Sequence, residues 1–334
     1  MTGPLALTTG DASGIGREIT LKAWQGRVQY NMPPFFAIDD PEHIESCATH
    51  LSLPVSIASI ESPQEALSVF QKALPVLPPD TTTTSNITLA SIQQGARLAW
   101  QGSAGGLVTN PVRKSVFAQA RLHHAGHTEY LAHYLGKLTC AQAPFPVMML
   151  TCPDLKVIPV TRHIPLATVS TTLTATLLTK TVRAAAHGLR SDFGIHQPRF
   201  AVAGLNPHAG EDGDIGNEEQ SIIIPAIKRL QSEEFDISGP FSADSLFHTN
   251  RQGGYDVILC MYHDQALIPI KTISFGRSVN VTLGLPIVRT SPDHGPAQDI
   301  AGQGRANPSS LIAALCLAGI CVHTKRTRHA KQHP

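Results

Sequence analysis

Charged residues are scarce in this chain. Asp, Glu, Lys and Arg make up 15% of its 334 residues, whereas about 25% is usual for globular proteins. The two signs nearly cancel, and the net charge of +1 gives no electrostatic reason to expect binding to nucleic acid or to an anionic membrane. A chain this poor in charge is expected to bury surface against itself or against a partner. We therefore predict an oligomer, with neither a nucleic-acid nor a membrane partner.

Cysteine motifs and long hydrophobic segments are also missing. None of the six cysteines belongs to a C-x-x-C pair, and Cys152, Cys260 and Cys316 lie in or beside apolar runs, where a free thiol behaves as a small hydrophobic residue. The N-terminal residues lack the features of a signal peptide, so we expect a reducing, cytoplasmic location. The longest apolar run starts at Leu311 and has 12 residues, whereas spanning a bilayer takes about 20. It predicts a buried helix, followed from His323 by a frayed, solvated basic tail.

Short runs rich in Val, Ile and Leu alternate with segments of helical length. The expected strands cover residues 4–9, 34–38, 105–109, 146–152, 156–161, 199–205 and 256–262. The expected helices include residues 62–74, 91–102, 127–138, 173–189, 217–231 and 308–319. This alternation predicts an α/β fold with a largely parallel sheet, and the length predicts two domains at roughly 150 residues each. The segment Leu74–Asn86, with its prolines and four consecutive threonines, is expected to be a loop.

Three histidines follow three of the expected strands. His163 follows residues 156–161, His208 follows 199–205, and His263 follows 256–262. Ligands of open α/β sheets bind where the strands end, so these imidazoles can converge there. Three protein ligands and one open position are typical of a catalytic divalent metal. The chain has 16 histidines, however, and any one of them alone is more often a surface or core residue, so the pattern by itself leaves both interpretations open.

Two glycine-containing segments are candidates for binding a cofactor. The turn "GDASGIGRE" follows the first strand and leads into a helix, whose N-terminal N–H groups suit a phosphate or carboxylate. It is not a G-x-G-x-x-G motif, because Ile19 occupies the third position, and a tight strand–helix turn is the alternative. The segment "SPDHGPAQDIAGQGRANPSS" has the composition of a loop that can wrap a nucleotide, although an ordinary surface loop fits equally well.

Eight blocks of the sequence resemble one enzyme family. They read "GDASGIGRE", "VTNPVRK", "AGHTEYLA", "TRHIPL", "GLNPHAGEDGDIGNEE", "GPFSADSLF", "YDVILCMYHDQALIPIK" and "FGRSVNVTLGLPIVRTSPDHGPAQDIAGQG". With them the chain resembles the 4-hydroxythreonine-4-phosphate dehydrogenases of pyridoxal phosphate biosynthesis and, more broadly, the isocitrate and isopropylmalate dehydrogenase-like superfamily. The resemblance implies a two-lobed α/β fold with a mixed, largely parallel sheet and an active site in the cleft between the lobes. It implies an NAD-binding lobe of residues 1–125 plus 285–334, and a metal, substrate and dimerisation lobe of residues 126–284.

The resemblance also implies roles for individual residues. The divalent metal (zinc, magnesium or cobalt) would be held by His163, His208 and His263, contributed by both subunits of a homodimer. The phosphorylated substrate would contact His127, Thr128, Lys271, Asn280 and Arg289. NAD, with NADP as the alternative, would bind the loop that contains Asp293, His294, Gly295, Asp299, Gly302 and Gly304.

The chain departs from the family pattern at three positions. Thr9 and Arg17 stand where the family usually has proline, and Arg113 stands where asparagine or histidine is common. All three belong to turns beside the expected cofactor cleft.

The expected reaction is oxidation of the secondary alcohol of 4-phosphohydroxy-L-threonine, with hydride transfer to NAD. The 3-oxo acid formed would then decarboxylate to 3-amino-2-oxopropyl phosphate. Lys271, Asp264 and Asp244 are the candidate catalytic residues, and a structural hydrogen-bonding role is the alternative for both aspartates. A paralogue that oxidises D-erythronate 4-phosphate or D-threonate 4-phosphate would share these blocks. A metal-dependent hydrolase or a non-catalytic metal-binding protein is less consistent with the nucleotide-type loop and with the cationic residues.

Overall fold

The structure is a computed structural model that describes residues 3–82, 84–119, 126–139, 143–250 and 254–332. The chain folds into two compact units. The first unit comprises Met1–Pro144 and Leu285–Pro334, and the second comprises Phe145–Gly284. The expected boundary near residue 125 differs from this division because the helix after it, α6 (His127–Thr139), packs with α4 (Ile87–Trp100) in the core of the first unit. Cys140 lies outside the described residues, and the other five cysteines are free thiols.

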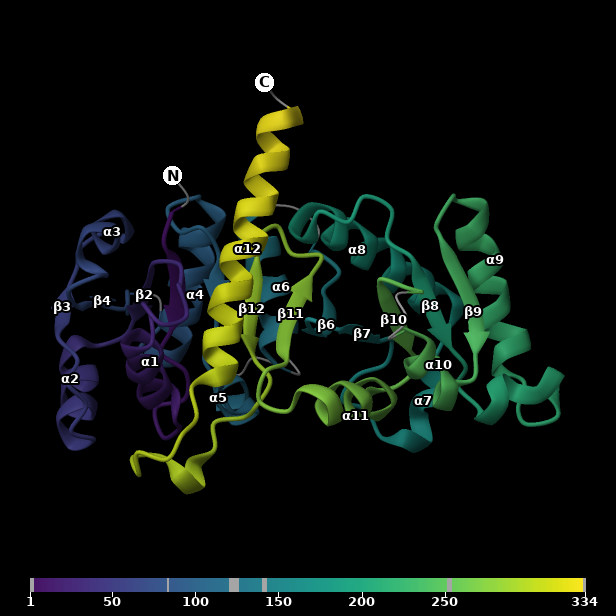
Figure 1. Cartoon of the computed structure of the whole chain (residues 1–334), viewed down its shortest axis with the longest axis horizontal. Helices are drawn as coiled ribbons and strands as arrows, with labels where there is room; N and C mark the ends of the chain where they lie inside the picture. Colours follow the sequence, from purple (N-terminus) through teal and green to yellow (C-terminus); the bar gives the residue numbers. More distant parts are fainter. Residues whose placement is uncertain (1–2, 83, 120–125, 140–142, 251–253, 333–334) are drawn as a thin grey trace. The chain divides into compact units, whose positions relative to one another are not determined.

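The first unit is built on a parallel sheet. Its strands are β1 (Leu5–Thr8), β2 (Phe35–Ile38), β3 (Ile57–Ser59), β4 (Leu74–Leu77), β5 (Leu107–Val108) and β12 (Arg289–Pro292), in the spatial order β3-β4-β2-β1-β5-β12. All these pairings are parallel. The helices are α1 (Gly16–Gln25), α2 (Pro41–His50), α3 (Ala66–Val69), α4, α5 (Lys114–Gln119), α6 and α12 (Ser309–Gln332). Helix α1 contacts α12, and α4 contacts α6 (Figure 1).

The second unit contains a mixed sheet. Its strands are β6 (Val147–Cys152), β7 (Leu155–Pro159), β8 (Phe200–Ala203), β9 (Ile237–Phe241), β10 (Val257–Cys260) and β11 (Val279–Leu283), in the order β11-β6-β7-β10-β8-β9. Strand β6 is antiparallel to its neighbours, whereas β7, β10, β8 and β9 run parallel to one another. The helices are α7 (Val169–Thr172), α8 (Ala175–Phe193), α9 (Ile224–Ser232), α10 (Ala243–Asn250) and α11 (His263–Ser274).

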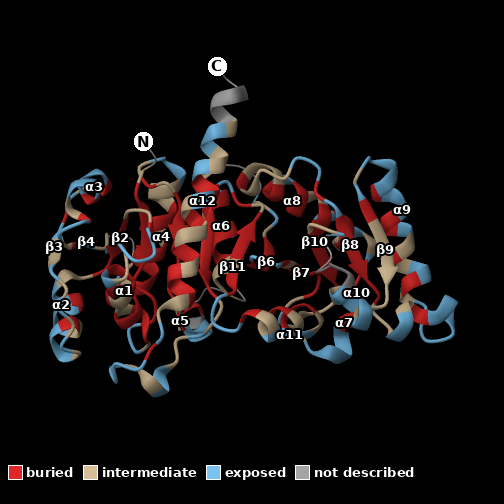
Figure 2. Cartoon of the chain, in the orientation of Figure 1, coloured by how far each residue is buried: buried red, intermediate tan, exposed pale blue. Residues whose placement is uncertain are grey.

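Both sheets are buried between helices, as their continuous apolar strands predict. Figure 2 shows most strands as buried, the edge strands β3 and β9 as largely intermediate, and the outer faces of the helices as exposed. Helix caps mark several boundaries: Asn86 Oδ1 accepts from Leu89 N at the start of α4, and α8 ends at Gly194, which has a φ of 71°. None of the described helices is long and apolar enough to cross a membrane.

The α/β class is confirmed, and each of the seven expected strands is present. Two local predictions are wrong. Residues Leu74–Leu77, expected to belong to a loop, form the buried strand β4, because Pro75 does not prevent the parallel pairing of its neighbours. The expected frayed tail continues α12 as far as Gln332.

Candidate active site

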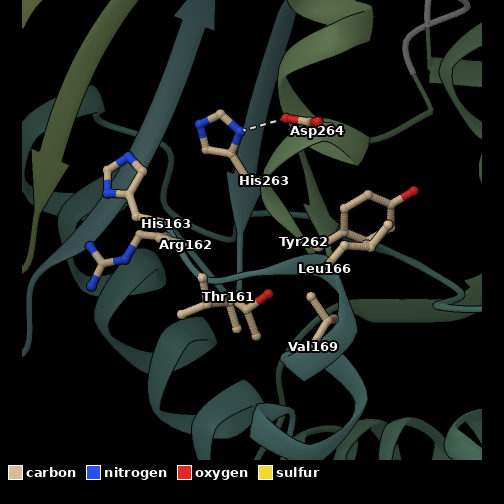
Figure 3. A pocket seen from close by; sticks show the side chains of 9 residues that line it. Thr161, Arg162, His163, Leu166, Val169, Tyr262, His263 and Asp264 are labelled. Atoms are coloured by element: carbon tan, nitrogen blue, oxygen red, sulfur yellow. Dashed lines mark hydrogen bonds and ion pairs between the residues drawn. The ribbon is translucent and has the colours of Figure 1, made fainter.

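Two of the three candidate metal ligands lie side by side in the second unit. His163 follows β7 and His263 follows β10, and these strands are parallel neighbours. Backbone hydrogen bonds continue the pairing past the strand ends, from Val160 N to Cys260 O (2.8 Å). The two ring centroids are 5.5 Å apart, and both rings line a cavity of about 290 Å³ (Figure 3).

The third candidate, His208, does not join this pair. Within the described part of the chain, no three His, Cys, Asp or Glu side chains form a group suited to a metal ion. His208 lies after β8, and both His163 and His208 have positive φ angles of 44° and 54°. Residues other than glycine rarely adopt this conformation, which costs roughly 1–2 kcal/mol per residue. The local backbone therefore holds both histidines in an unusual conformation.

A carboxylate contacts the Nδ1 atom of two of these histidines. His263 Nδ1 donates to Asp264 Oδ1 over 2.7 Å, and His208 Nδ1 donates to Glu211 Oε1 over 2.5 Å. With Nδ1 protonated, the neutral ring keeps its lone pair on Nε2. This pairing is the usual environment of a metal-binding histidine, because the carboxylate fixes the tautomer and the ring orientation. The donor set therefore fits a divalent metal.

Asp244, at the start of α10, lies near His208. It accepts a hydrogen bond from Ser242 Oγ over 2.5 Å. This bond is the main cause of the lowered pKa of Asp244, and the positive charge that His208 carries when protonated lowers it further. The carboxylate is consequently ionised and close to one of the candidate ligands.

Lys271 shares helix α11 with His263. The positions of His263, Leu267 and Lys271 are spaced by four residues, which places them along one stripe of a helix. All three line a cavity of about 520 Å³ that Asp264 also lines. In β11, Asn280 has a buried Oδ1 atom for which the described residues supply no hydrogen-bond partner. Such an atom suits a ligand with a donor group.

The first unit contains a buried arginine. Arg289 begins β12 with an exposed fraction of 3%, and its Nη2 donates to the buried Thr109 Oγ1 over 2.6 Å. Burial lowers the pKa of Arg289 to about 10, while the charge of Glu129 acts in the opposite direction. Arg289 is therefore still a cation at neutral pH.

His127, the first residue of α6, lies near that cation. The residue is half-buried, but its Nε2 atom is enclosed and has no hydrogen-bond partner among the described residues. Burial, together with the charge of Arg289, lowers the pKa of His127 to about 3. The imidazole is thus neutral at physiological pH and can accept or donate a hydrogen bond. Thr128 follows it and is also half-buried.

The glycine-rich turn contacts the candidate cofactor loop. Ile15 N donates to Pro296 O over 3.0 Å, and Gln298 Nε2 donates to Ser13 Oγ. Gly14 is required here, since a Cβ atom at this position would lie 2.8 Å from both Cβ and O of Pro296. The Ser13, Gly14 and Ile15 amides already donate to protein acceptors. These three amides therefore have protein acceptors, as a tight strand–helix turn requires, and the phosphate-binding interpretation of the turn stays a prediction.

The loop itself presents open polar positions. His294 Nδ1 donates to Gly295 O over 2.9 Å, and its enclosed Nε2 atom has no partner in the described structure. A Cβ atom at Gly295 would meet nothing within 4 Å, and Asp299 is exposed. Asp293, Gly302 and Gly304 complete the candidate set, and both glycines have positive φ angles. These features fit a nucleotide.

The three departures from the family pattern all contact buried carboxylates. Thr9 Oγ1 donates to Asp39 Oδ2 over 2.5 Å, and Arg17 contacts both oxygens of Asp39 at 2.9 and 3.0 Å. Asp39 follows β2, at a position where dinucleotide-binding sheets often have an acidic residue that binds a ribose hydroxyl. Here both carboxylate oxygens of Asp39 already accept hydrogen bonds from Thr9 or Arg17. Arg113 Nε donates to Asp11 Oδ2 over 2.7 Å. Burial raises the pKa of Asp11, but the hydrogen bonds from Ser13 and Arg113 outweigh this effect and lower it overall.

Three residues that the sequence did not single out act on candidate site residues: Thr109 and Glu211 by hydrogen bonds, and Glu129 by its charge. Each lies inside a recognised block, but an isolated hydroxyl or carboxylate carries no signal of its contact with Arg289 or His208. Those contacts exist only in the folded chain.

Taken together, these features define a two-unit α/β protein with paired imidazoles in one unit and a buried cationic arginine in the other. Comparison with known proteins identifies its family. Residues 31–318 match the model of the pyridoxal phosphate biosynthetic protein PdxA, and the chain belongs to this family.

Curated relatives and solved structures agree with this assignment. The chain is 48% identical to the 4-hydroxythreonine-4-phosphate dehydrogenase of Bradyrhizobium diazoefficiens, over 94% of this chain and 96% of that protein. It shares the fold of the Klebsiella pneumoniae 4-hydroxythreonine-4-phosphate dehydrogenase, with a TM-score of 0.82 and 30% identity, over 96% of this chain and 99% of the other. A terephthalate 1,2-cis-dihydrodiol dehydrogenase from Burkholderia xenovorans LB400 is less similar, with a TM-score of 0.61 and 26% identity over 96% and 98% of the chains.

Proposed function

We propose that this protein oxidises 4-phosphohydroxy-L-threonine in pyridoxal 5'-phosphate biosynthesis, using NAD and a divalent metal. The observation that carries the proposal is Arg289, a cation with 3% exposure that lies near the neutral His127. A buried guanidinium whose plane is held by a neighbouring hydroxyl suits bidentate recognition of phosphate or carboxylate. The activity of the 48% identical relative supports the same substrate class.

We assign the metal to His163, His208 and His263, with Asp264 and Glu211 orienting two of the rings. The donor chemistry suits zinc, cobalt or magnesium in decreasing order, because imidazole is a softer ligand than carboxylate or water. When bound, the ion supplies Lewis acidity that lowers the pKa of the substrate hydroxyl and polarises the carbonyl formed from it.

We assign NAD to the loop that contains Asp293, His294, Gly295, Asp299, Gly302 and Gly304. When bound, NAD accepts the hydride from the secondary alcohol. NADP remains the alternative cofactor.

The chain's own residues would bind the substrate and move its proton. Arg289 and Lys271 are the cations for its phosphate and carboxylate, and His127, Thr128 and Asn280 supply uncharged polar groups. Asp264 and Asp244 are the candidate acceptors of the hydroxyl proton, directly or through water. The 3-oxo acid formed by the oxidation would then lose carbon dioxide, and the bonding electrons would stay on the product as an enolate. A cation such as Lys271 would stabilise this enolate.

We further propose that the protein is a homodimer in which His208 and the His163–His263 pair come from different subunits. The support is twofold: His208 does not join the pair within one chain, and three exposed apolar side chains lie on the linings of the two cavities beside His263. These are Leu166 (71% exposed), Ile268 (65%) and Phe275 (86%). Exposed apolar clusters of this kind mark interaction surfaces.

The test is NADH formation from purified protein, NAD and 4-phosphohydroxy-L-threonine, with and without a chelator. Reduction that the chelator abolishes and zinc restores would establish substrate, cofactor and metal together. Reduction with D-erythronate 4-phosphate alone would assign the chain to the sugar-acid paralogues. Absence of reduction with both substrates in metal-supplied buffer would overturn the proposal.

A further inference from the structure

Lys22 and Glu18 connect helix α1 to the far end of the candidate cofactor loop. Lys22 Nζ donates to Glu18 Oε1 (2.7 Å), to Gly304 O (2.8 Å) and to Ala306 O (2.8 Å). In the opposite direction, Ala306 N donates to Glu18 Oε1 over 2.8 Å. One of these four bonds lies within α1. The other three join α1 to residues more than 280 positions further along the chain.

The environment of this network distinguishes it from a surface ion pair. The Glu18 side chain is 2% exposed and that of Lys22 19% exposed. An ammonium group has three N–H donors, and each of those on Lys22 has an acceptor here. On α1 alone, the two residues would form an ordinary i,i+4 pair that contributes a few tenths of a kcal/mol. Its additional bonds to the carbonyls of Gly304 and Ala306 make Lys22 a link between α1 and the loop.

The network completes the attachment of the loop to α1 and its preceding turn. Pro296 O and Gln298 bind the turn near one end of the loop, and Gly304 and Ala306 bind Lys22 near the other. Between them, His50 Nε2 lies 3.1 Å from Gly302 O. Gly302 and Gly304, both in left-handed conformations, let the backbone turn its carbonyls toward these partners.

We propose that Lys22 and Glu18 are positioning residues for nucleotide binding: they hold the loop of residues 293–306 in its binding conformation before the cofactor arrives. The inference rests on the proposed function, which places NAD on this loop. Ordering a loop on binding reduces affinity, and a loop that is already ordered avoids this cost. Neither residue needs to touch the nucleotide.

Trypsin provides a direct measure of loop opening. Arg305 is exposed and lies between the two residues whose carbonyls bind Lys22. Cleavage after Arg305 requires local release of the backbone from the network. The substitution Lys22→Met keeps an unbranched side chain that is one atom shorter and removes all three donors. Because hydrogen bonds to charged groups are the stronger ones, we expect about tenfold faster cleavage after Arg305 and about tenfold weaker NAD binding, measured by titration without substrate.

A second variant separates loss of the loop attachment from a general loss of folding. Lys22→Met leaves the Glu18 carboxylate buried without its cation, which can destabilise the whole unit. The double variant Glu18→Gln/Lys22→Met removes both charges and keeps an oxygen for Ala306 N. Lys72→Met, at an exposed lysine of the same unit, is the matched control. The double variant should retain a cooperative unfolding transition and unchanged zinc affinity, with faster cleavage and weaker NAD binding, whereas Lys72→Met should resemble wild type.

The measurements distinguish failure of the positioning role from failure of the proposed cofactor. Unchanged cleavage and unchanged NAD affinity in the folded double variant would overturn the inference. Faster cleavage with unchanged NAD affinity would also overturn it, because the loop would then be held for another reason. Wild-type protein that binds neither NAD nor NADP would refute the proposed cofactor, and the positioning role would fall with it even if cleavage accelerates.

Discussion

Arg289 shows how much of this site depends on single side chains whose environment the sequence does not reveal. The resemblance predicted its contact with substrate, but its burial and its bond to Thr109 follow from the pairing of β5 with β12. Since Thr109 Oγ1 accepts from Nη2, this bond orients one end of the guanidinium before a ligand arrives. Preorganisation of this kind is what distinguishes a binding arginine from a solvated one.

The substitution Arg289→Lys tests this role. A lysine keeps the charge but offers a point donor, which cannot bind Thr109 and the substrate anion in the same planar geometry. We expect the KM for the phosphorylated substrate to rise by about tenfold to a hundredfold, while the KM for NAD stays within about twofold. Steady-state kinetics with each substrate varied in turn supply the measurement. Equal increases in both constants would contradict the assignment.

Thr109 offers a matched pair of variants for the same question. Thr109→Val removes the hydroxyl at nearly constant shape, and Thr109→Ser retains it. In the valine variant the KM for the phosphorylated substrate should rise less than in Arg289→Lys, with the KM for NAD nearly unchanged. The serine variant should have the kinetic constants of wild type. A serine variant as impaired as the valine variant would point to packing instead of hydrogen bonding.

The low pKa of His127 gives a second prediction at this scale. In the unfolded chain the pKa is about 6.5, whereas in the folded protein burial and Arg289 lower it to about 3. Below pH 6.5 the unfolded state therefore binds a proton that the folded state does not, so this group destabilises the fold as pH falls from 6.5 toward 3. Its contribution is constant above that window.

Denaturant unfolding of wild type and His127→Gln at pH 8, 6.5 and 5 isolates the effect, because the other titrating groups cancel in the difference. The stability of wild type relative to the variant should be constant from pH 8 to about 7 and should decrease toward pH 5. Parallel losses in the two proteins would show that His127 protonates normally in the folded state.

Seven of the twelve described strands were predicted from the sequence, whereas β3, β4, β9, β11 and β12 were not, and contacts between distant elements were not predicted either. The seven strand predictions held because buried strands, parallel or antiparallel, are continuous apolar runs bounded by turn residues. Strand β4 was missed because the prolines around Val76 resemble a connector. The attachment of residues 293–306 to α1 had no signal in the sequence, because Lys22 and Glu18 have the spacing of any exposed helical ion pair.

Gly14 tests the contact between these elements. A Cβ atom would overlap Pro296, so Gly14→Ala should displace the loop and destabilise the protein by about 1–3 kcal/mol, the usual cost of overpacking. Gly295→Ala is the matched control, since its Cβ would meet nothing within 4 Å, and it should leave the stability unchanged. Thermal unfolding compares the two. A Gly14→Ala variant as stable as Gly295→Ala would show that the turn and the loop separate readily in solution.

At the scale of the whole molecule, the described residues of one chain bring together only two of the three candidate metal-binding histidines, His163 and His263. The sequence located each histidine after a strand, and the structure places them after β7, β8 and β10 of one parallel set. A sequence pattern cannot tell whether ligands converge within a subunit or between subunits, because both arrangements need the same strand ends. The exposed apolar residues near His163 and His263 favour assembly between subunits.

Phe275→Asp provides the test of that assembly. Phe275 is 86% exposed after α11, and an aspartate there would have to be desolvated in a dimer interface, at a cost of several kcal/mol. Sedimentation velocity should show a dimer for wild type and monomers for the variant. Zinc affinity should fall in parallel, because a monomer would keep the His163–His263 pair but lose His208 of the partner subunit. Val28→Asp, at a residue 74% exposed in the first unit, should leave both measurements unchanged. A monomeric Phe275→Asp variant that binds zinc like wild type would place the third ligand within the same chain, and a dimeric variant would place the interface on another surface.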